Sequence, residues 1–341
     1  MRIDAWTHLL SPAYVEQLKR REPRGRASFF LAQRALHDVD LRLRTIDDHA
    51  DYRQVLTPLP GPLVFETGIT PAELARENND QLAEIVERHP DQFAGFAAAT
   101  PLTDPDAATA EAIRAVTDLG ALGIQLEADA VNLPLHEPRY EPLFAAMDEL
   151  GAAVWLHPCR TPGRPGFAAD TAPFLLWQIL GWTFDTTITI SQLIFAGIYD
   201  RHPDLKLIAH HGAGLIPHFS GRLEMMPLLA GLDPTGSLGQ ALDRLQNEPT
   251  DYYKKLYVDC AMFGSEHAVR CVVDFFGPDR VLFASDTPFD GQAGSYFIPR
   301  TTLDVEGAIE VQADRDAIFY GNANRTLRTK TAGLPLAERL G

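Results

Sequence analysis

Short hydrophobic runs alternate with longer amphipathic stretches along most of the chain. The short runs are almost continuous in apolar residues, which is typical of parallel strands that helices cover. In the stretches between them, apolar residues recur at the three- and four-residue intervals of a helix. Strands are predicted at residues 2–6, 53–57, 93–97, 122–126, 153–156, 205–209, 256–260 and 280–284.

The stretches between the predicted strands carry helix signals. The clearest starts at Thr70, where proline follows the capping threonine and Glu73 completes a capping box. Residues 21–37 and 159–182 lack a regular pattern and are predicted to be insertions. Helices are predicted at residues 38–50, 70–89, 104–119, 137–151, 185–200 and 265–276, and residues 322–327 are expected to close the fold.

Eight strand–helix units in 341 residues favour an α/β fold, the (β/α)₈ TIM barrel. The insertions are then expected over the C-terminal mouth of the barrel. A doubly wound sheet is the alternative, but it requires a glycine-rich phosphate loop after the first strand, and the sequence has none there. Without internal repeats or a low-complexity linker, residues 1–341 are predicted to form one domain.

Charge and cysteine usage narrow the class of protein. The formal net charge is −16 and no basic block offsets it, which argues against nucleic acid or an anionic membrane as a partner. No stretch approaches the roughly 18 apolar residues of a membrane span, and the N-terminus lacks the pattern of a signal peptide. The 3 cysteines are widely spaced, which fits a reducing compartment. A cytoplasmic protein is predicted.

Polar residues with metal-binding chemistry follow several predicted strands. His8, His157 and His211 follow the first, fifth and sixth strands, and Asp286 follows the eighth. In a barrel these strand ends meet at one face, where catalytic groups lie. Each residue alone could be structural, but imidazoles and a carboxylate together suit a Zn²⁺-type ion. Strand alternation predicts that His210 points away from His211 and serves packing or support.

Ordered motifs make nearly the whole chain similar to the amidohydrolase superfamily, in the branch of aminocarboxymuconate-semialdehyde decarboxylase and the aromatic-acid decarboxylases. The first motif is Ile3-Asp-Ala-Trp-Thr-His8, and a later one is His211-Gly-Ala-Gly214. Each is weak alone, but their order and spacing are specific. The motifs cover residues 3–8, 123–126, 140–144, 150–158, 203–214, 221–223, 282–289 and 321–324.

This resemblance implies a TIM barrel of the metal-dependent hydrolase type and a metal site with one altered position. His8, His157 and Asp286 would be ligands of one divalent ion, most readily Zn²⁺, with Mn²⁺ or Mg²⁺ as alternatives. His211 would be the general acid/base. The family's first ligand position holds Trp6, which cannot ligate a metal and is expected to contact substrate instead. Residues 123–128 offer no lysine to bridge a second ion.

The resemblance also implies a carboxylate anchor and a second subunit. Arg222 would reach a neighbouring subunit's site and bind the substrate carboxylate, so a homodimer is expected. Arg42 or Arg44 could supply a second anchor. Apart from the resemblance, the insertion at residues 159–182 contains four aromatic residues, Phe167, Phe174, Trp177 and Trp182. Phe174, Trp177 and Trp182 are expected to pack under a lid, with an aromatic wall or a dimer contact as the alternatives.

These features predict a metal-dependent non-oxidative decarboxylase, a carboxy-lyase of a small aromatic or unsaturated carboxylic acid. A metal-dependent hydrolase of an amide, lactone or related bond is the alternative, because it needs the same ion and base. A metal-free binding barrel is the third reading, and Trp6 is its main support.

Overall fold

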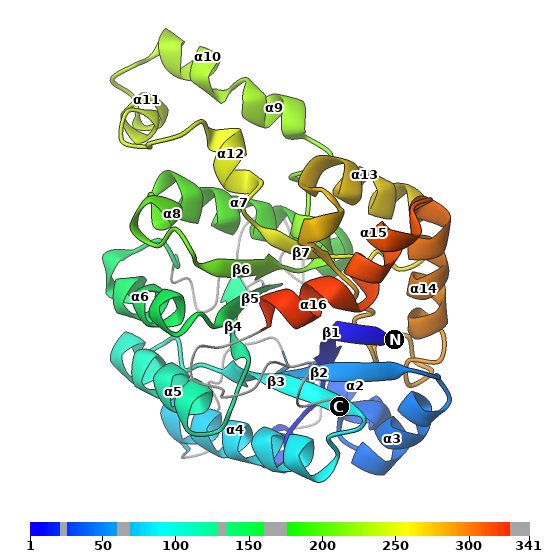
Figure 1. Cartoon of the computed structure of the whole chain (residues 1–341). Coiled ribbons are helices and arrows are strands. Elements are labelled where there is room, and N and C mark those ends of the chain that lie inside the picture. The colour runs from blue at the N-terminus through cyan, green and yellow to red at the C-terminus, as the bar shows by residue number, and fades with distance from the viewer. Residues whose placement is uncertain (21–25, 60–68, 129–133, 160–175, 328–341) are drawn as a thin grey trace.

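Eight parallel strands follow one another around one sheet in chain order, from β1 to β8 (Figure 1). The computed structural model describes residues 1–20, 26–59, 69–128, 134–159 and 176–327. Ala5 N donates to Phe283 O and Asp286 N to Trp6 O, so the segment directly after β8 bonds back to β1 and nearly closes the ring. The predicted (β/α)₈ barrel is confirmed. The strands are β1 (Arg2–His8), β2 (Tyr52–Thr57), β3 (Phe93–Ala99), β4 (Gly123–Ala128), β5 (Ala153–Pro158), β6 (Lys206–Ala209), β7 (Tyr257–Asp259) and β8 (Val281–Leu282).

Helices cover the outside of the barrel close to where the sequence predicts them. The predicted capping box is present, since the Thr70 side chain accepts from Glu73 N and the Glu73 side chain accepts from Thr70 N. The helix predicted at 185–200 is broken at Gly197, whose φ of 79° is left-handed. The helices are α1 (Pro12–Arg20), α2 (Arg26–Ala32), α3 (Val39–Asp47), α4 (Pro71–Arg88), α5 (Pro105–Thr117), α6 (Glu141–Leu150), α7 (Trp182–Phe195), α8 (Ile198–Arg201), α9 (Ser220–Glu224), α10 (Met226–Leu232), α11 (Ser237–Leu242), α12 (Pro249–Tyr253), α13 (Glu266–Phe276), α14 (Phe297–Ala308), α15 (Gln312–Asp316) and α16 (Asn322–Thr326). Short 3₁₀ or π turns are η1 (Arg34–Leu36), η3 (Pro138–Tyr140), η4 (Trp177–Gly181), η5 (His211–Ala213), η6 (Pro278–Arg280) and η7 (Ala317–Gly321).

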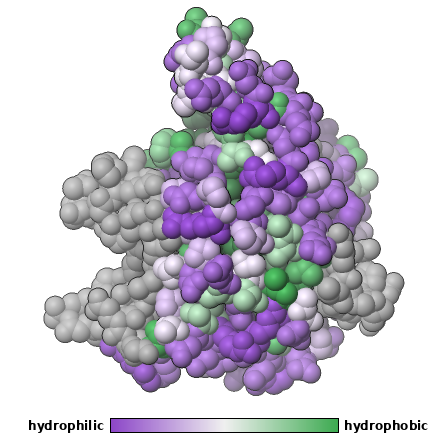
Figure 2. Space-filling view, turned by 90° about the vertical axis from the view of Figure 1, so that its left-hand side faces the viewer, coloured by the Kyte–Doolittle hydropathy of each residue, from purple (hydrophilic) through white to green (hydrophobic). Residues whose placement is uncertain are grey.

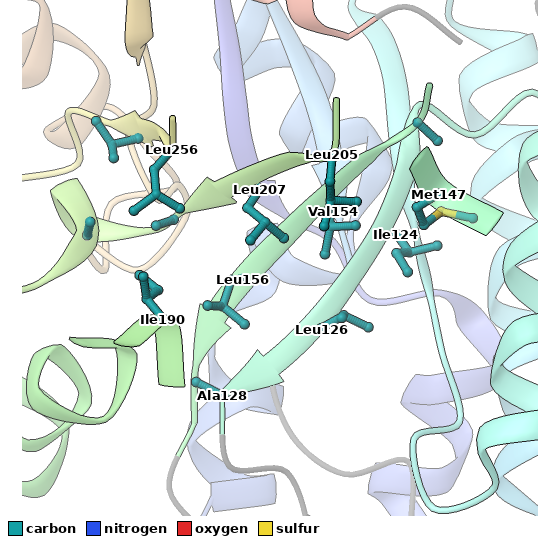
Figure 3. Close-up of a cluster of buried hydrophobic side chains, with 14 of the residues drawn as sticks. Ile124, Leu126, Ala128, Met147, Val154, Leu156, Ile190, Leu205, Leu207 and Leu256 are labelled. Atoms are coloured by element: carbon teal, nitrogen blue, oxygen red, sulfur yellow. The ribbon is translucent and has the colours of Figure 1, made fainter. Parts of the chain in front are cut away.

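Alternate residues of the strands enter two different hydrophobic layers. In β6, Leu207 and Ala209 pack outward in the layer shared with the helices, whereas Ile208 belongs to the cluster inside the barrel. Figure 3 shows the outer layer, where side chains of β4, β5 and β6 meet Met147 of α6 and Ile190 of α7. This alternation fixes the direction of the polar side chains at the strand ends.

Two segments project beyond the regular barrel. Part of the predicted first insertion forms α2, and its Phe29 and Phe30 rings lie near Phe289. Helices α9 to α12 form an arm, residues 220–253, that stands out from the barrel (Figure 1). Figure 2 shows hydrophobic residues at the tip of this arm, and the α10 side chains Leu228 and Leu232 are 73% and 83% exposed. Within the described ranges, no helix combines the length and apolar composition needed to span a bilayer.

Candidate active site

Four imidazoles and one carboxylate gather at the C-terminal ends of the strands. His8 ends β1, His157 lies near the end of β5, His210 and His211 follow β6, and Asp286 follows β8. One potential ligand atom from each of His8, His157 and His210 lies within 4.8 Å of the others, and the same holds for His210, His211 and Asp286. The three histidines and the aspartate predicted from strand ends therefore lie together, and His210 lies with them.

Protein acceptors orient all four rings in the same way. Each has its Nδ1 within hydrogen-bond distance of an oxygen, which in a neutral ring favours the tautomer that donates from Nδ1 and leaves the Nε2 lone pair available. Acceptors that fix ring orientation in this manner are typical of metal-ligating histidines. The contacts are His8 Nδ1 to Pro58 O at 2.8 Å, His157 Nδ1 to Pro158 O at 2.5 Å, His210 Nδ1 to Asp259 Oδ2, and His211 Nδ1 to Ala261 O at 3.0 Å.

The donor set fits a divalent metal ion. His8 Nε2 is buried and has no hydrogen-bond partner among the described residues, although it lies 3.3 Å from Asp286 Oδ1. Burial, reinforced by the neighbouring imidazoles, lowers the pKa of His157 well below its usual value and keeps the ring neutral. For Asp286, contacts with His210 and His8 outweigh burial and lower the pKa of the carboxyl. Neutral imidazoles and an ionised carboxylate are the forms that bind metal.

The expectation that His210 points away from the site is wrong. Its Nδ1 contacts Asp259 Oδ2, its Nε2 lies 3.3 Å from Asp286 Oδ1, and its ring stacks on Trp6 with centroids 4.0 Å apart. Because Ile208 faces the barrel interior, the residue two positions on does so too. His211 reaches the same site because the strand has ended and its φ of 51° turns the chain back.

The two adjacent imidazoles have opposite electrostatic surroundings. Burial lowers the pKa of His210, but the carboxylates of Asp259 and Asp286 outweigh burial and raise it to about 9. The ring of His211 is partly exposed, yet the surrounding protein and the neighbouring His210 lower its pKa to about 4. The rings stack with centroids 3.7 Å apart. At neutral pH and without a metal, the pair therefore holds its proton on His210.

Trp6 fills the floor of the site. Its side chain is 0% exposed, lies face to face with His210 at an interplanar angle of 11°, and is tilted against His157 with centroids 5.8 Å apart. The indole Nε1 has no hydrogen-bond partner among the described residues. Trp6 thus lies on the same side of β1 as His8, as alternation predicts, at the position where the family resemblance implied a metal ligand.

Asp259 is a site residue that the sequence analysis missed. It is fully buried at the end of β7, and it accepts bonds from Ala261 N at 3.1 Å and Gly212 N at 3.3 Å as well as contacting His210. The available signal was its position, because a carboxylate ending an apolar strand points to the barrel's catalytic face.

The structure separates the remaining candidate anchors. The prediction that Arg42 could anchor the substrate is wrong, because its buried guanidinium already donates hydrogen bonds to Ala35 O, Gln54 Oε1 and His8 O. Arg44 is exposed on α3, and Arg222 is exposed on α9 in the arm.

The aromatic insertion is described only at its end. The ring of Trp182 meets His157 edge to face at 5.7 Å, so it borders the site. Trp177 begins η4. Phe167 and Phe174 lie outside the described residues.

Comparisons with known proteins agree with this architecture. A family profile described as Amidohydrolase matches residues 3–329. A gamma-resorcylate decarboxylase of Rhizobium radiobacter is 29% identical over 309 residues, which cover 87% of this chain and 89% of the relative. The crystal structure of 2,6-dihydroxybenzoate decarboxylase from Rhizobium matches with a TM-score of 0.79 and 25% identity, covering 96% of this chain and 98% of that one. A dihydroxybenzoic acid decarboxylase from Polaromonas, solved with manganese and 2-nitroresorcinol, has a TM-score of 0.78 and 22% identity, covering 98% of this chain and 99% of that one.

Proposed function

The chain belongs to the amidohydrolase family, and from that premise we infer that it is a metal-dependent non-oxidative decarboxylase, a carboxy-lyase of a small aromatic or unsaturated carboxylic acid. The observation that carries the inference is the convergence of His8, His157 and Asp286 at one barrel mouth. The matches to proteins named as decarboxylases cover most of this chain, which supports the inference. We take residues 1–341 as one barrel domain.

We propose His8, His157 and Asp286 as the residues that hold one divalent ion. The imidazoles favour Zn²⁺, whereas manganese is bound in the Polaromonas neighbour. When bound, such an ion would orient the substrate's oxygens and stabilise negative charge that develops in the reaction. The Nδ1 acceptors fix the His8 and His157 rings, so that each Nε2 is preorganised toward the site.

Decarboxylation needs a proton at the carbon that carries the carboxylate. That carbon gains the proton, its bond to the carboxylate breaks, CO₂ leaves, and the electron pair of the bond restores the unsaturated system. We assign the proton to the His210–His211 pair. His210 is the first candidate because it is the ring that carries the proton at neutral pH, since Asp259 contacts its Nδ1 and stabilises the imidazolium. His211, the residue favoured by the sequence, is the second candidate for the same role.

Substrate contacts are proposed for two further residues. The Trp6 indole would form an apolar floor beneath the unsaturated part of the substrate, since it lies against His210 and His157. Arg222 would bind the carboxylate by a two-pronged guanidinium contact. Because Arg222 is exposed on the arm, we propose a homodimer in which the arm reaches the partner's site. The exposed leucines of α10 supply apolar surface for that association.

We also propose a cytoplasmic location. All 3 cysteines lie in the described part of the chain, and Cys260 and Cys271 form no disulfide there. Free cysteines that form no disulfide are typical of proteins in a reducing compartment. Fractionation of the cells that produce the protein would test this.

A product analysis separates the two catalytic readings. The protein is incubated with Zn²⁺ or Mn²⁺ and a panel of aromatic and unsaturated carboxylic acids that includes members with an amide or lactone bond, and released CO₂ is measured beside newly formed acid. The proposal predicts one CO₂ for each molecule consumed. New acid without CO₂ would establish a hydrolase, and a protein that binds the acids without converting them would be a binding barrel. The His157→Ala variant removes a proposed metal ligand and should abolish turnover. His267→Ala is its matched control, because His267 is exposed on α13.

A further inference from the structure

A continuous line of buried side-chain hydrogen bonds runs beside the cluster of imidazoles. It joins α3, β2, β1 and the segment after β8. Its five members, Arg42, Gln54, Tyr52, Asp4 and Ser285, are at most 4% exposed. Along the line, Arg42 Nη1 donates to Gln54 Oε1 at 3.0 Å, Gln54 Nε2 to Tyr52 Oη at 3.1 Å, Tyr52 Oη to Asp4 Oδ2 at 2.5 Å, and Ser285 Oγ to Asp4 Oδ2 at 2.5 Å.

One end of this line meets the backbone of His8, and the other meets the backbone of Ser285, the residue before Asp286. At one end, Arg42 Nη2 donates to the carbonyl oxygen of His8. At the other end, Asp4 accepts from the backbone N–H of Ser285 at 3.0 Å, directly before Asp286. Asp286 has a φ of 61°, a left-handed conformation that is uncommon for a residue with a side chain. The bonds from Asp4 fix Ser285, the residue directly before this turn.

The line also joins two buried groups of opposite charge. Arg42 and Asp4 are these fully buried groups, and Gln54 and Tyr52 connect them. Buried ionic groups add little to stability compared with well-packed apolar residues, because desolvation offsets their attraction. A fully satisfied polar network does, however, fix the geometry of the groups that it contacts. The placement of both ends at site residues therefore indicates a role in geometry.

We propose that Asp4 and Arg42 are positioning residues, and that the line between them sets the separation of His8 and Asp286. In the structure His8 Nε2 and Asp286 Oδ1 are 3.3 Å apart, close enough for both to bind one ion. The inference rests on the proposed function in taking these two residues as metal ligands. Tyr52 is the middle of the line and contacts neither ligand, so its hydroxyl is the part to remove.

Tyr52→Phe deletes one oxygen and breaks the line while keeping the ring. Glu111→Gln is the matched control, because Glu111 belongs to another buried network, with Arg114 Nε at 2.8 Å and Asn79 Nδ2 at 2.8 Å, between α4 and α5. Two quantities are measured: the affinity for Mn²⁺, and the ¹⁵N NMR signal of His8 in metal-free protein, assigned with His8→Gln. Ser285→Ala, which cuts the line at the other side of Asp4, serves if Tyr52→Phe does not fold.

Loss of outer contacts to metal ligands typically lowers affinity by about tenfold to a hundredfold. The proposal predicts such a loss and a shifted His8 signal for Tyr52→Phe, with neither change for Glu111→Gln. An affinity within twofold of the wild type and an unmoved His8 signal would overturn it, as would equal losses in both variants. If the wild type binds no metal, the proposed function fails, and the His8 signal alone decides whether the line positions the ring.

Discussion

The buried carboxyl of Asp4 should make the stability of the protein depend on pH in a defined window. Burial raises its pKa, bonds from Ser285 and Tyr52 partly offset the rise, and the pKa reaches about 6 instead of the ordinary 3.8. The folded protein therefore binds a proton between these values that the unfolded chain releases. A raised pKa adds stability that is complete below pH 3.8 and is lost as the pH rises through about 6.

The size of the effect follows from the shift. The difference between 6 and 3.8 is 2.2 pKa units, and each unit corresponds to about 1.4 kcal/mol, so the free energy of unfolding should fall by about 3 kcal/mol across the window. Asparagine at this position cannot titrate. The Asp4→Asn variant should therefore lose about 3 kcal/mol less than the wild type over the same pH range.

Urea unfolding measures this difference directly. Wild type and Asp4→Asn are unfolded at a series of pH values between 4 and 7, with a chelator present so that metal binding does not contribute. Other carboxyls titrate in both proteins, and their contribution cancels in the difference. If the two curves of stability against pH were parallel, Asp4 would be ionised throughout this range, and its pKa in the folded protein would not be raised.

Four further predictions concern the proposed site. His157→Ala should retain less than about a tenth of an equivalent of metal by elemental analysis, while His267→Ala keeps the wild-type amount. His210→Asn should lower turnover by about 10²- to 10⁴-fold with metal still bound, and a larger loss in His211→Asn would move the proton-donor role to that residue. Arg222→Ala should raise KM for the carboxylate by about tenfold to a hundredfold, with exposed Arg244→Ala unchanged. Trp6→Ala should destabilise the fold by about 3–5 kcal/mol in urea unfolding because the ring is 0% exposed, and Trp6→Phe should lose far less.

The sequence was sufficient for the barrel because its strands are short, apolar and regularly spaced. All eight predicted runs are strands of the sheet, with ends that differ by a few residues. Helix boundaries set by local bonds were also predictable, as the capping box at Thr70 shows. The break at Gly197 was not, because glycine within a helix is often tolerated and its left-handed φ depends on the turn into α8.

The sequence predicted only those site residues that lie at the ends of predicted strands. His8, His157 and Asp286 follow this rule, and they lie together. The direction of the His210 side chain could not be predicted from the sequence. After Lys206 at its edge, β6 is apolar on both faces, so the pattern does not distinguish the inner face from the outer one. Ile208 faces inward, and this fact appears only once the sheet has closed.

Arg42 and Asp259 show a second limit of sequence reasoning. A buried arginine and a substrate-binding arginine look alike in sequence, because the difference lies in which acceptors surround the guanidinium. Here the acceptors come from residues 35, 54 and 8, which only the folded chain brings together. Asp259 gains its meaning in the same way, through its contact with His210 from the neighbouring strand.

The central claim is that a bound ion and the barrel-mouth residues together remove CO₂ from a carboxylic acid. The most direct test is to titrate metal-free protein with Mn²⁺ or Zn²⁺ and to measure CO₂ release from a panel of aromatic and unsaturated acids that includes 2,6-dihydroxybenzoate. The account predicts release that rises in proportion to bound metal, stops rising at one equivalent, and is absent in His157→Ala. Release that does not depend on bound metal, or a metal-loaded protein that releases CO₂ from no acid of the panel, would contradict it.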